Sequence, residues 1–284
     1  MLDEPRSGRM AAWGNALLAG LISPDEAAER ITGDDAVHRV SELPNSSGPD
    51  AECEPAPIGL TLALGRLRSL GTEGLRVALP APGHPLGLSG PPEFNSRALE
   101  ANEAVLATGS GIGLTPEVYE VGPEGDVHAE VTWRCMPVRE GPPADVPSLS
   151  EAERELAEAM REATEVLTEL DVAGSGPAAN AALDAYRARM EAGRRLLAPG
   201  YPPRAVRVLE LAQRVQALVA IAYGEEGGAA TAGGRPDGRE HGGAVSASQI
   251  TARAEALRPV ERTARRAQVA AYNAYAEELD RKRS

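Results

Sequence analysis

The sequence is poor in aromatic residues, which make up 3% of its 284 positions and include a single Phe. Hydrophobic residues still account for 42% of the chain, so an apolar core must be built mainly from Leu, Val and Ala. Long apolar runs are also missing, because none approaches the ~20 residues that a membrane-spanning helix needs. The apolar stretch at 11–22 follows Asp3 and Glu4 and has no A-x-A cleavage site after it, unlike a secretory leader. These absences predict a soluble protein of closely packed helices.

Cysteine is equally scarce. Cys53 and Cys135 are the only two, and they form no metal-binding or redox motif. So few cysteines fit a reducing compartment, which predicts a cytoplasmic protein. The sequence contains no G-x-S-x-G, P-loop, H-E-x-x-H or C-x-x-C pattern. We therefore assign no catalytic residue, no metal and no cofactor, and leave open whether the protein is an enzyme.

Positive charge is lacking in the first half of the chain. The net charge is −13, and residues 1–149 hold 22 acidic and 10 basic residues, whereas residues 150–284 hold 20 and 19. An acidic surface repels phosphate backbones, which argues against nucleic-acid binding. The expected partners are a protein or a second copy of the chain, with a small molecule as the other possibility.

The first 43 residues predict a helical hairpin. A stripe through Trp13 and Leu17 indicates the first helix. The run Ser23-Pro24-Asp25-Glu26 is typical of a helix start, with a capping serine and a proline at the first helical position. This second helix is expected to end at Gly33, and His38 to lie at a helix end. A Pro-rich linker follows at 44–57.

Residues 58–137 predict a small α/β domain. A leucine stripe marks a helix that ends at Gly71, and Leu75–Leu79 reads as a short strand. A Pro/Gly-rich loop, a helix from Pro91 and a strand at 104–108 come next. Residues 117–121 and 127–136 predict a hairpin around GPEGD. We expect a mixed sheet of about four strands with helices on one face.

Residues 148–284 predict a helical bundle. A capping box at Ser150-x-x-Glu153 opens a helix with an apolar seam from Leu156 to Leu170. Further helices are predicted around Leu183–Leu197, after Pro202-Pro203, and from Ser246 onward, where Pro259 should kink or split the last one. Residues 224–243 are rich in glycine and charge, which predicts a flexible loop. The fold class is α+β, with a small mixed sheet in the first half, a helical bundle in the second, and mostly α structure overall.

The loop at 81–90 is the candidate ligand site. It follows a strand and precedes a helix start, where exposed amides and the helix dipole favour ligands in α/β proteins. Its five flanking and internal prolines remove many amide donors, so a rigid structural crossover is the favoured interpretation. The candidate ligand-binding residues are His84, Ser89, Glu93 and Asn95.

Two further patterns are interpreted as structural. The glycines at 109–113 lack the spacing and the following helix of a dinucleotide-binding turn, which indicates a glycine-rich turn. Asp126, His128 and Glu130 share one strand face, and we interpret them as a solvated surface rather than a metal site.

Taken in order, several segments resemble a family of uncharacterised actinobacterial proteins. They are the helical hairpin with Trp13 and SPDE, LALGRLRSLG, LRVALPAPGHPLGLSGPPEFN, PGYPPRAVRVL and LRPVERTARRAQVAAYNAY. The resemblance spans nearly the whole chain and implies a bacterial, cytoplasmic protein. It implies no activity, so it assigns no catalytic residue.

The function that fits these observations is a non-enzymatic interaction or regulatory protein that acts through its helical half. The seam from Leu156 would then serve as a docking or dimerisation surface. The alternative is a small-molecule-binding protein or enzyme that uses the 81–90 loop, with His84 as the acid-base group. Nucleic-acid binding through the arginine-rich helices is a third and weaker hypothesis.

Overall fold

The computed structural model describes residues 4–45, 56–123, 126–139, 141, 143–169, 197–231 and 247–283. In these residues it contains seven helices and six strands, and the fold is α+β and mostly helical, as the sequence predicts. The chain forms two compact units. The sheet unit holds the described residues of 4–147, 197–206 and 269–283, and the helical unit holds those of 148–169, 207–231 and 247–268.

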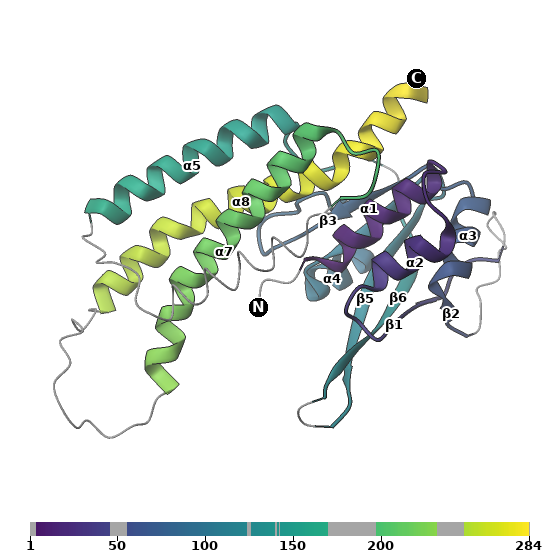
Figure 1. Cartoon of the computed structure of the whole chain (residues 1–284), viewed down its shortest axis with the longest axis horizontal. Coiled ribbons are helices and arrows are strands. Elements are labelled where there is room, and N and C mark those ends of the chain that lie inside the picture. The colour runs from purple at the N-terminus through teal and green to yellow at the C-terminus, as the bar shows by residue number, and fades with distance from the viewer. Residues whose placement is uncertain are drawn as a thin grey trace. The chain divides into compact units, whose positions relative to one another are not determined.

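The sheet unit is built on a six-stranded mixed sheet with the order β2-β1-β6-β5-β4-β3 (Figure 1). Only β1 and β6 pair in parallel, and the other neighbours are antiparallel. The strands are β1 Val37–Ser41, β2 Ile58–Gly59, β3 Gly74–Ala78, β4 Ala104–Thr108, β5 Ile112–Val121 and β6 His128–Pro137.

Two of these strands, β1 and β2, were missed by the sequence analysis. The prediction that His38 lies at a helix end is wrong, because His38 is the second residue of β1. The strand β1 is held by pairing with residues 130–134 of β6, far away in sequence, and β2 is only two residues long. Such pairing leaves no local pattern that a sequence reading can detect.

The predicted helical hairpin is present as α1 Arg6–Leu18 and α2 Pro24–Thr32. The Ser23 hydroxyl accepts a hydrogen bond from the Glu26 amide at 3.2 Å, and Gly33 ends the helix with a positive φ of 56°. Helix α1 is buried on nearly all sides, from Ser7 to Leu17. The hairpin is therefore part of the core of the sheet unit.

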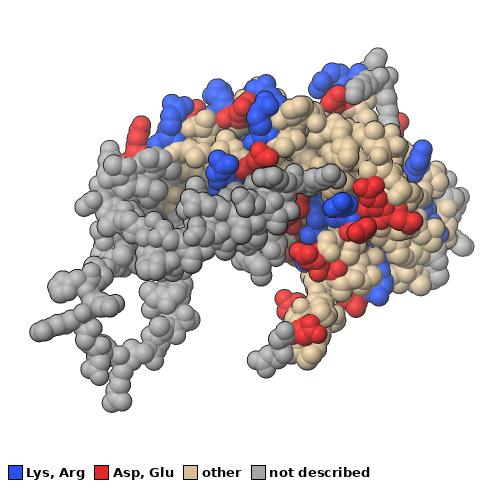
Figure 2. All heavy atoms as spheres, in the orientation of Figure 1, with Lys and Arg blue, Asp and Glu red and all other residues tan. Residues whose placement is uncertain are grey.

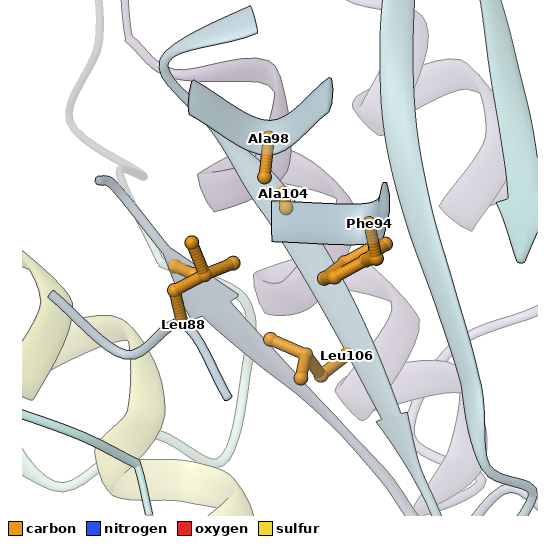
Figure 3. Close-up of a cluster of buried hydrophobic side chains, with 6 residues drawn as sticks. Leu88, Phe94, Ala98, Ala104 and Leu106 are labelled. Atoms are coloured by element: carbon orange, nitrogen blue, oxygen red, sulfur yellow. The ribbon is translucent and has the colours of Figure 1, made fainter. Parts of the chain in front are cut away.

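Helices lie on both faces of the sheet, where one face was expected. Leu75 of β3 points at Gly14 of α1, since a Cβ built on that glycine would lie 2.3 Å from the Leu75 side chain. Even-numbered residues of β3 and β4, in contrast to the odd-numbered Leu75, pack against Phe94 of α4 Pro92–Ala101 (Figure 3). Because successive strand residues point to opposite faces, α1 and α4 cover different faces. The members of the α4 cluster are Ala78, Leu88, Phe94, Ala98, Ala104 and Leu106.

The outer edge of the sheet, strand β3, is closed by two asparagines. The carboxamide of Asn15 accepts from the Leu75 amide at 2.7 Å and donates to the Leu75 carbonyl at 2.9 Å. Asn273, on α8 Ala247–Arg283, does the same at Val77, with distances of 2.7 Å and 3.0 Å. An unpaired buried amide or carbonyl is costly, so these side chains replace the strand that β3 lacks.

The helical unit contains α5 Leu149–Glu169, most of α7 Pro203–Thr231 and the first part of α8. Leu156 is fully buried, and Ala152 and Ala159 on the same stripe of α5 are buried as well. Glu155 forms an ion pair with Arg266 of α8 at 2.7 Å. Gln216 and Gln268 exchange two amide hydrogen bonds between α7 and α8, at 3.1 Å and 2.6 Å.

Several predicted helix boundaries change. The capping box of α5 is formed by Ser148 and Glu151, which exchange side-chain to backbone hydrogen bonds at 3.3 Å and 2.9 Å, and not by Ser150 and Glu153. Helix α8 continues through Pro259 without a break. Helix α7 extends to Thr231, into the segment predicted as a loop.

The third predicted capping serine, Ser246, and the predicted stripe at Leu183, Tyr186 and Met190 lie outside the described residues, as do Cys53 and His241. Across the described ranges, no helix combines the length and the apolar character that crossing a membrane requires.

Candidate functional site

The loop that follows β3 is a tightly hydrogen-bonded turn. Ala81 and His84 exchange backbone hydrogen bonds at 2.9 Å and 2.8 Å. Between them lie Pro82 and Gly83, whose φ of +80° is that of the third residue of a type II turn. The Leu79 amide donates to the Leu86 carbonyl at 3.0 Å, so the loop folds back on itself as a short hairpin.

The second part of the loop is anchored in the core. Leu86 and Leu88 are buried, and the amide of Gly87 donates to the Ala144 carbonyl at 2.8 Å. Gly87 has a φ of +94°, and a Cβ at this position would lie 2.8 Å from the carbonyl oxygen of Val77. Only glycine fits so close to the strand in this conformation. These are the contacts of a fixed crossover between β3 and α4.

The four predicted ligand-binding residues are not joined to one another. His84 and Ser89 are half-buried, Glu93 is exposed, and Asn95 is half-buried on α4. All four lie in the described part of the chain, and no hydrogen bond or ion pair links any two of them there. The Oδ1 atom of Asn95 is enclosed and has no hydrogen-bond partner. This oxygen is a buried polar atom of the loop region that lacks a hydrogen-bond partner.

The strand arrangement also removes one argument for a ligand here. Ligands bind at the carboxyl ends of parallel strands where the strand order reverses. Strands β3 and β4 are antiparallel neighbours, so the loop does not lie at such a point.

A polar cluster around Asp35 was not predicted. The Asp35 carboxylate accepts two hydrogen bonds from Arg6, at 3.0 Å and 2.7 Å, and another from Arg9. The fourth comes from the Nε2 atom of His38 at 3.0 Å. Burial opposes the ionisation of Asp35, but the hydrogen bond from His38 and the two guanidinium groups outweigh it and hold the pKa of Asp35 well below its usual range.

An Asp–His pair is a common acid-base device, but here both ring nitrogens of His38 are engaged. The Nδ1 atom accepts a hydrogen bond from the indole Nε1 of Trp133 at 3.2 Å, so the proton lies on Nε2 and is donated to Asp35. The side chain of His38 is 0% exposed. General acid-base catalysis needs a nitrogen within reach of a substrate, and this arrangement offers none. The cluster fastens α1 and α2 to β1 and β6.

A second cluster lies at the start of α1, where Pro5 provides no capping side chain. Glu103 accepts a hydrogen bond from the Ser7 amide at 2.7 Å, which places a carboxylate at the positive end of the helix dipole. Glu4 accepts a hydrogen bond from the Tyr272 hydroxyl of α8 at 3.2 Å. Desolvation raises the pKa of Glu4 to about 7 and also raises the pKa of Glu103.

The two patterns that were interpreted as structural both belong to the sheet unit. Asp126 and His128 approach to 3.4 Å on the β5–β6 hairpin, and Glu130 pairs with Arg39 at 2.9 Å. No three ligand-type side chains converge on a metal site in the described ranges. Gly109 and Gly111 form the turn between β4 and β5, and a strand follows them, unlike a dinucleotide-binding turn.

Two family models match the chain, and both describe Rv1486c-like proteins. The model of the N-terminal domain of Rv1486c-like proteins matches residues 7–147, and the model of the C-terminal domain matches residues 150–237. The uncharacterised protein Rv1486c of Mycobacterium tuberculosis is 30% identical, and the alignment covers 93% of this chain and 95% of that protein. The uncharacterised protein ML1804 of Mycobacterium leprae is 28% identical with the same coverage. No solved structure matches the chain.

The expected resemblance to an uncharacterised actinobacterial family is therefore confirmed. None of these relatives carries a described activity in its name, so no residue role can be transferred from them.

Proposed function

The chain belongs to the family of Rv1486c-like proteins, and we propose that it is a non-enzymatic interaction or regulatory protein of the bacterial cytoplasm that acts through its helical unit. The sheet unit serves as the folded base to which the last part of α8 is fastened.

The observation that carries this proposal is that the polar side chains that cluster in the sheet unit form hydrogen bonds with other groups of the same chain. The Asp35 carboxylate is occupied by Arg6, Arg9 and His38, and the remaining ring nitrogen of His38 by Trp133. The carboxamides of Asn15 and Asn273 are hydrogen-bonded to the backbone of β3. A catalytic group must be free to reach a substrate, whereas these groups hold helices and strands together.

The helical unit supports the proposal through the surface of α5. Its apolar stripe at Leu156 is filled inside the chain, which leaves a charged face toward solvent. Acidic and basic side chains alternate along this face, an arrangement that favours recognition by charge complementarity. The exposed charged residues among the described side chains of α5 include Glu151, Arg154, Glu158, Arg161, Glu162 and Glu165.

The test is cross-linking of the tagged chain in actinobacterial cells, compared with the double variant Arg154→Glu, Arg161→Glu. A partner that docks on α5 should be lost from this variant. The matched control is Arg68→Glu, Arg281→Glu, which reverses the same number of exposed charges on the sheet unit and should retain the partner. Identical capture by both double variants would contradict a role for the helical unit.

The alternative, ligand binding or catalysis at the 81–90 loop, is favoured by the unsatisfied Oδ1 of Asn95. It predicts that a nucleotide, sugar phosphate or amino acid raises the melting temperature of the purified protein. A ligand at 100 times its Kd stabilises the folded state by about 2.7 kcal/mol. A shift that disappears in His84→Ala and Asn95→Ala, with both variants folded, would replace the interaction proposal with this one.

A further inference from the structure

The β5–β6 hairpin extends past the rest of the sheet (Figure 1). The two strands pair along their whole length, from Ile112 opposite Pro137 to Val121 opposite His128. On one side, β4 pairs only with residues 112–114 of β5, and on the other, β1 pairs only with residues 130–134 of β6. Residues 116–123 and 126–131, here called the hairpin arm, thus form a ribbon of two strands. It is buried at its base, at Pro116 and Val131, where β1 pairs with β6, and exposed beyond that base.

One edge of this arm is open. The Gly111 carbonyl accepts from the Val138 amide at 2.8 Å, and this register turns the backbone groups of odd-numbered β5 residues toward β6. The even-numbered residues turn the other way. Ile112 and Leu114 meet β4 there, but past Leu114 no described strand is paired with β5 on this side.

The open edge presents the amides and carbonyls of Val118 and Glu120 to an incoming strand. Pro116 offers only its carbonyl, because proline has no amide hydrogen. The β6 edge of the arm is less open, since the Ala36 amide donates to the Ala129 carbonyl at 2.8 Å. At about 3.3 Å per residue, residues 116–121 span roughly 20 Å, the length of an ordinary strand.

The arm also exposes apolar side chains. Seven large hydrophobic residues are exposed in the described part of the chain, and four of them lie on the arm: Val118 at 43%, Tyr119 at 54%, Val121 at 39% and Val127 at 53%. A two-stranded ribbon is marginally stable in water, and an additional strand buries part of this surface. Apolar side chains beside an open edge are therefore suited to strand addition.

The charge of the arm selects the partner. Its described residues include four carboxylates, at Glu117, Glu120, Asp126 and Glu130, and no Lys or Arg. Figure 2 shows acidic residues gathered on this projection. Glu117 lies between Arg97 and Arg134, and Glu130 pairs with Arg39, but those cations come from outside the arm. A second copy would bring the same carboxylates against Glu120, and anionic lipid or nucleic acid would be repelled.

We propose that the hairpin arm is a docking site for a basic, extended segment of another protein, which adds as a strand to the open edge of β5 at Val118 and Glu120. Backbone hydrogen bonds fix the strand, the exposed valines contact its apolar side chains, and the carboxylates select basic residues. This site is separate from the charged face of α5, and either one can fail without the other.

The probe is a fluorescent heptapeptide that alternates valine and arginine, titrated against the full chain with anisotropy as the readout. Wild-type protein should bind it, and the affinity should fall as salt is added. Hydrogen exchange at the Val118 and Glu120 amides should slow on binding, while the Glu117 and Tyr119 amides, which already face β6, should change little. A peptide with glutamate in place of arginine should not bind.

Two variants report on different parts of the site. Val118→Pro removes one outward amide and should abolish binding, and Pro116 shows that the same edge tolerates proline. Glu120→Lys keeps the backbone and should weaken binding at least about tenfold, since repulsion replaces attraction. The matched control is Glu100→Lys, at an exposed position of α4, which should bind like wild type.

Equal binding by Glu120→Lys and Glu100→Lys would overturn the proposal even if Val118→Pro fails to fold. So would peptide binding without slower exchange at Val118 and Glu120, or no binding up to millimolar peptide. Slower exchange that depends on protein concentration alone would assign the edge to a second copy instead. Binding of the arm to anionic vesicles or to DNA in place of the peptide would likewise overturn it.

Discussion

Asn15 and Asn273 hold the same edge strand in the same way, although they come from opposite ends of the chain. Each carboxamide satisfies both backbone groups of one outward-facing residue of β3, Leu75 for Asn15 and Val77 for Asn273. The end of α8 is therefore hydrogen-bonded to the sheet at the position where another strand would pair. The edge of β3 is closed by this means, whereas the edge of β5 past Leu114 is open.

Replacement of Asn273 by alanine should destabilise the protein. The Val77 amide and carbonyl would both lose their partner in a buried site, and each unsatisfied group costs about 1–3 kcal/mol. We expect a loss of about 2–6 kcal/mol in the free energy of unfolding, measured with urea. Arg281→Ala, an exposed change on the same helix, should have almost no effect. A similar loss in both variants would contradict the role given to the carboxamide.

The close contact of α1 with α8 depends on Gly8. A Cβ built at this position would lie 2.5 Å from the ring of Tyr272, so Gly8→Ala should force the two helices apart. Overpacking of this kind costs about 1–3 kcal/mol. The matched control is Gly65→Ala in α3 Leu60–Ser69, where a Cβ would meet nothing within 4 Å. That change should stabilise the protein by about 0.5–1 kcal/mol, because alanine favours the helix. Thermal unfolding of the two variants should shift in opposite directions.

Stability should decrease as the pH rises from mildly acidic to neutral. Desolvation raises the pKa of Glu4 from 4.5 to about 7. The contribution of Glu4 to the free energy of unfolding is therefore fully present below pH 4.5 and is lost as the pH rises through about 7. One pKa unit corresponds to about 1.4 kcal/mol, so the contribution of this group to the free energy of unfolding is at most about 3–4 kcal/mol. Glu103 acts in the same direction. Urea unfolding at several pH values should show a smaller decline in Glu4→Gln than in wild type, and parallel declines would disprove the assignment.

As the pH falls into the acidic range, the Asp35 cluster should make the largest contribution to the loss of stability. The pKa of Asp35 is lowered in the folded state, so its contribution is present above the usual carboxyl range and is lost as the pH falls below it. Asp35→Asn leaves Arg6, Arg9 and His38 without their common acceptor and should cost about 3 kcal/mol near neutral pH. The neighbouring exposed Asp34→Asn serves as the control and should change little. Acid unfolding of Asp35→Asn should also be less steep than that of wild type.

The apolar seam of α5 should stabilise the folded chain by packing inside it and not by binding a second copy. Leu156 is 0% exposed, so Leu156→Ala should cost about 2–5 kcal/mol through the cavity it leaves. Glu158→Ala, exposed two residues later, should cost little. Analytical ultracentrifugation should show the same oligomeric state for wild type and Leu156→Ala. A dimer that dissociates in this variant would instead identify the seam as an interface between copies.

The sequence by itself determined the local features of this protein. Ser23 and Gly33 bound α2 as predicted, because capping and positive φ depend on neighbouring residues only. The apolar periods located α3, the strand β3 to within one residue at each end, and the alternation of β6 at Val131, Trp133 and Cys135. The choice of Ser150 over Ser148 as the cap of α5 was wrong, since both serines have a glutamate three residues later and only the backbone path selects between them.

Only the tertiary structure decided the rest. The strand β1 exists through its pairing with β6, and the Asp35–His38–Trp133 contacts exist because that pairing brings the three residues together. The strand–loop–helix order that suggested a ligand role for His84, Ser89, Glu93 and Asn95 is typical of parallel sheets, whereas β3 and β4 are antiparallel. That role stays a prediction. Asn15 and Asn273 carry no sequence signal, because a buried carboxamide gains its value from a backbone that is distant in sequence and adjacent in space.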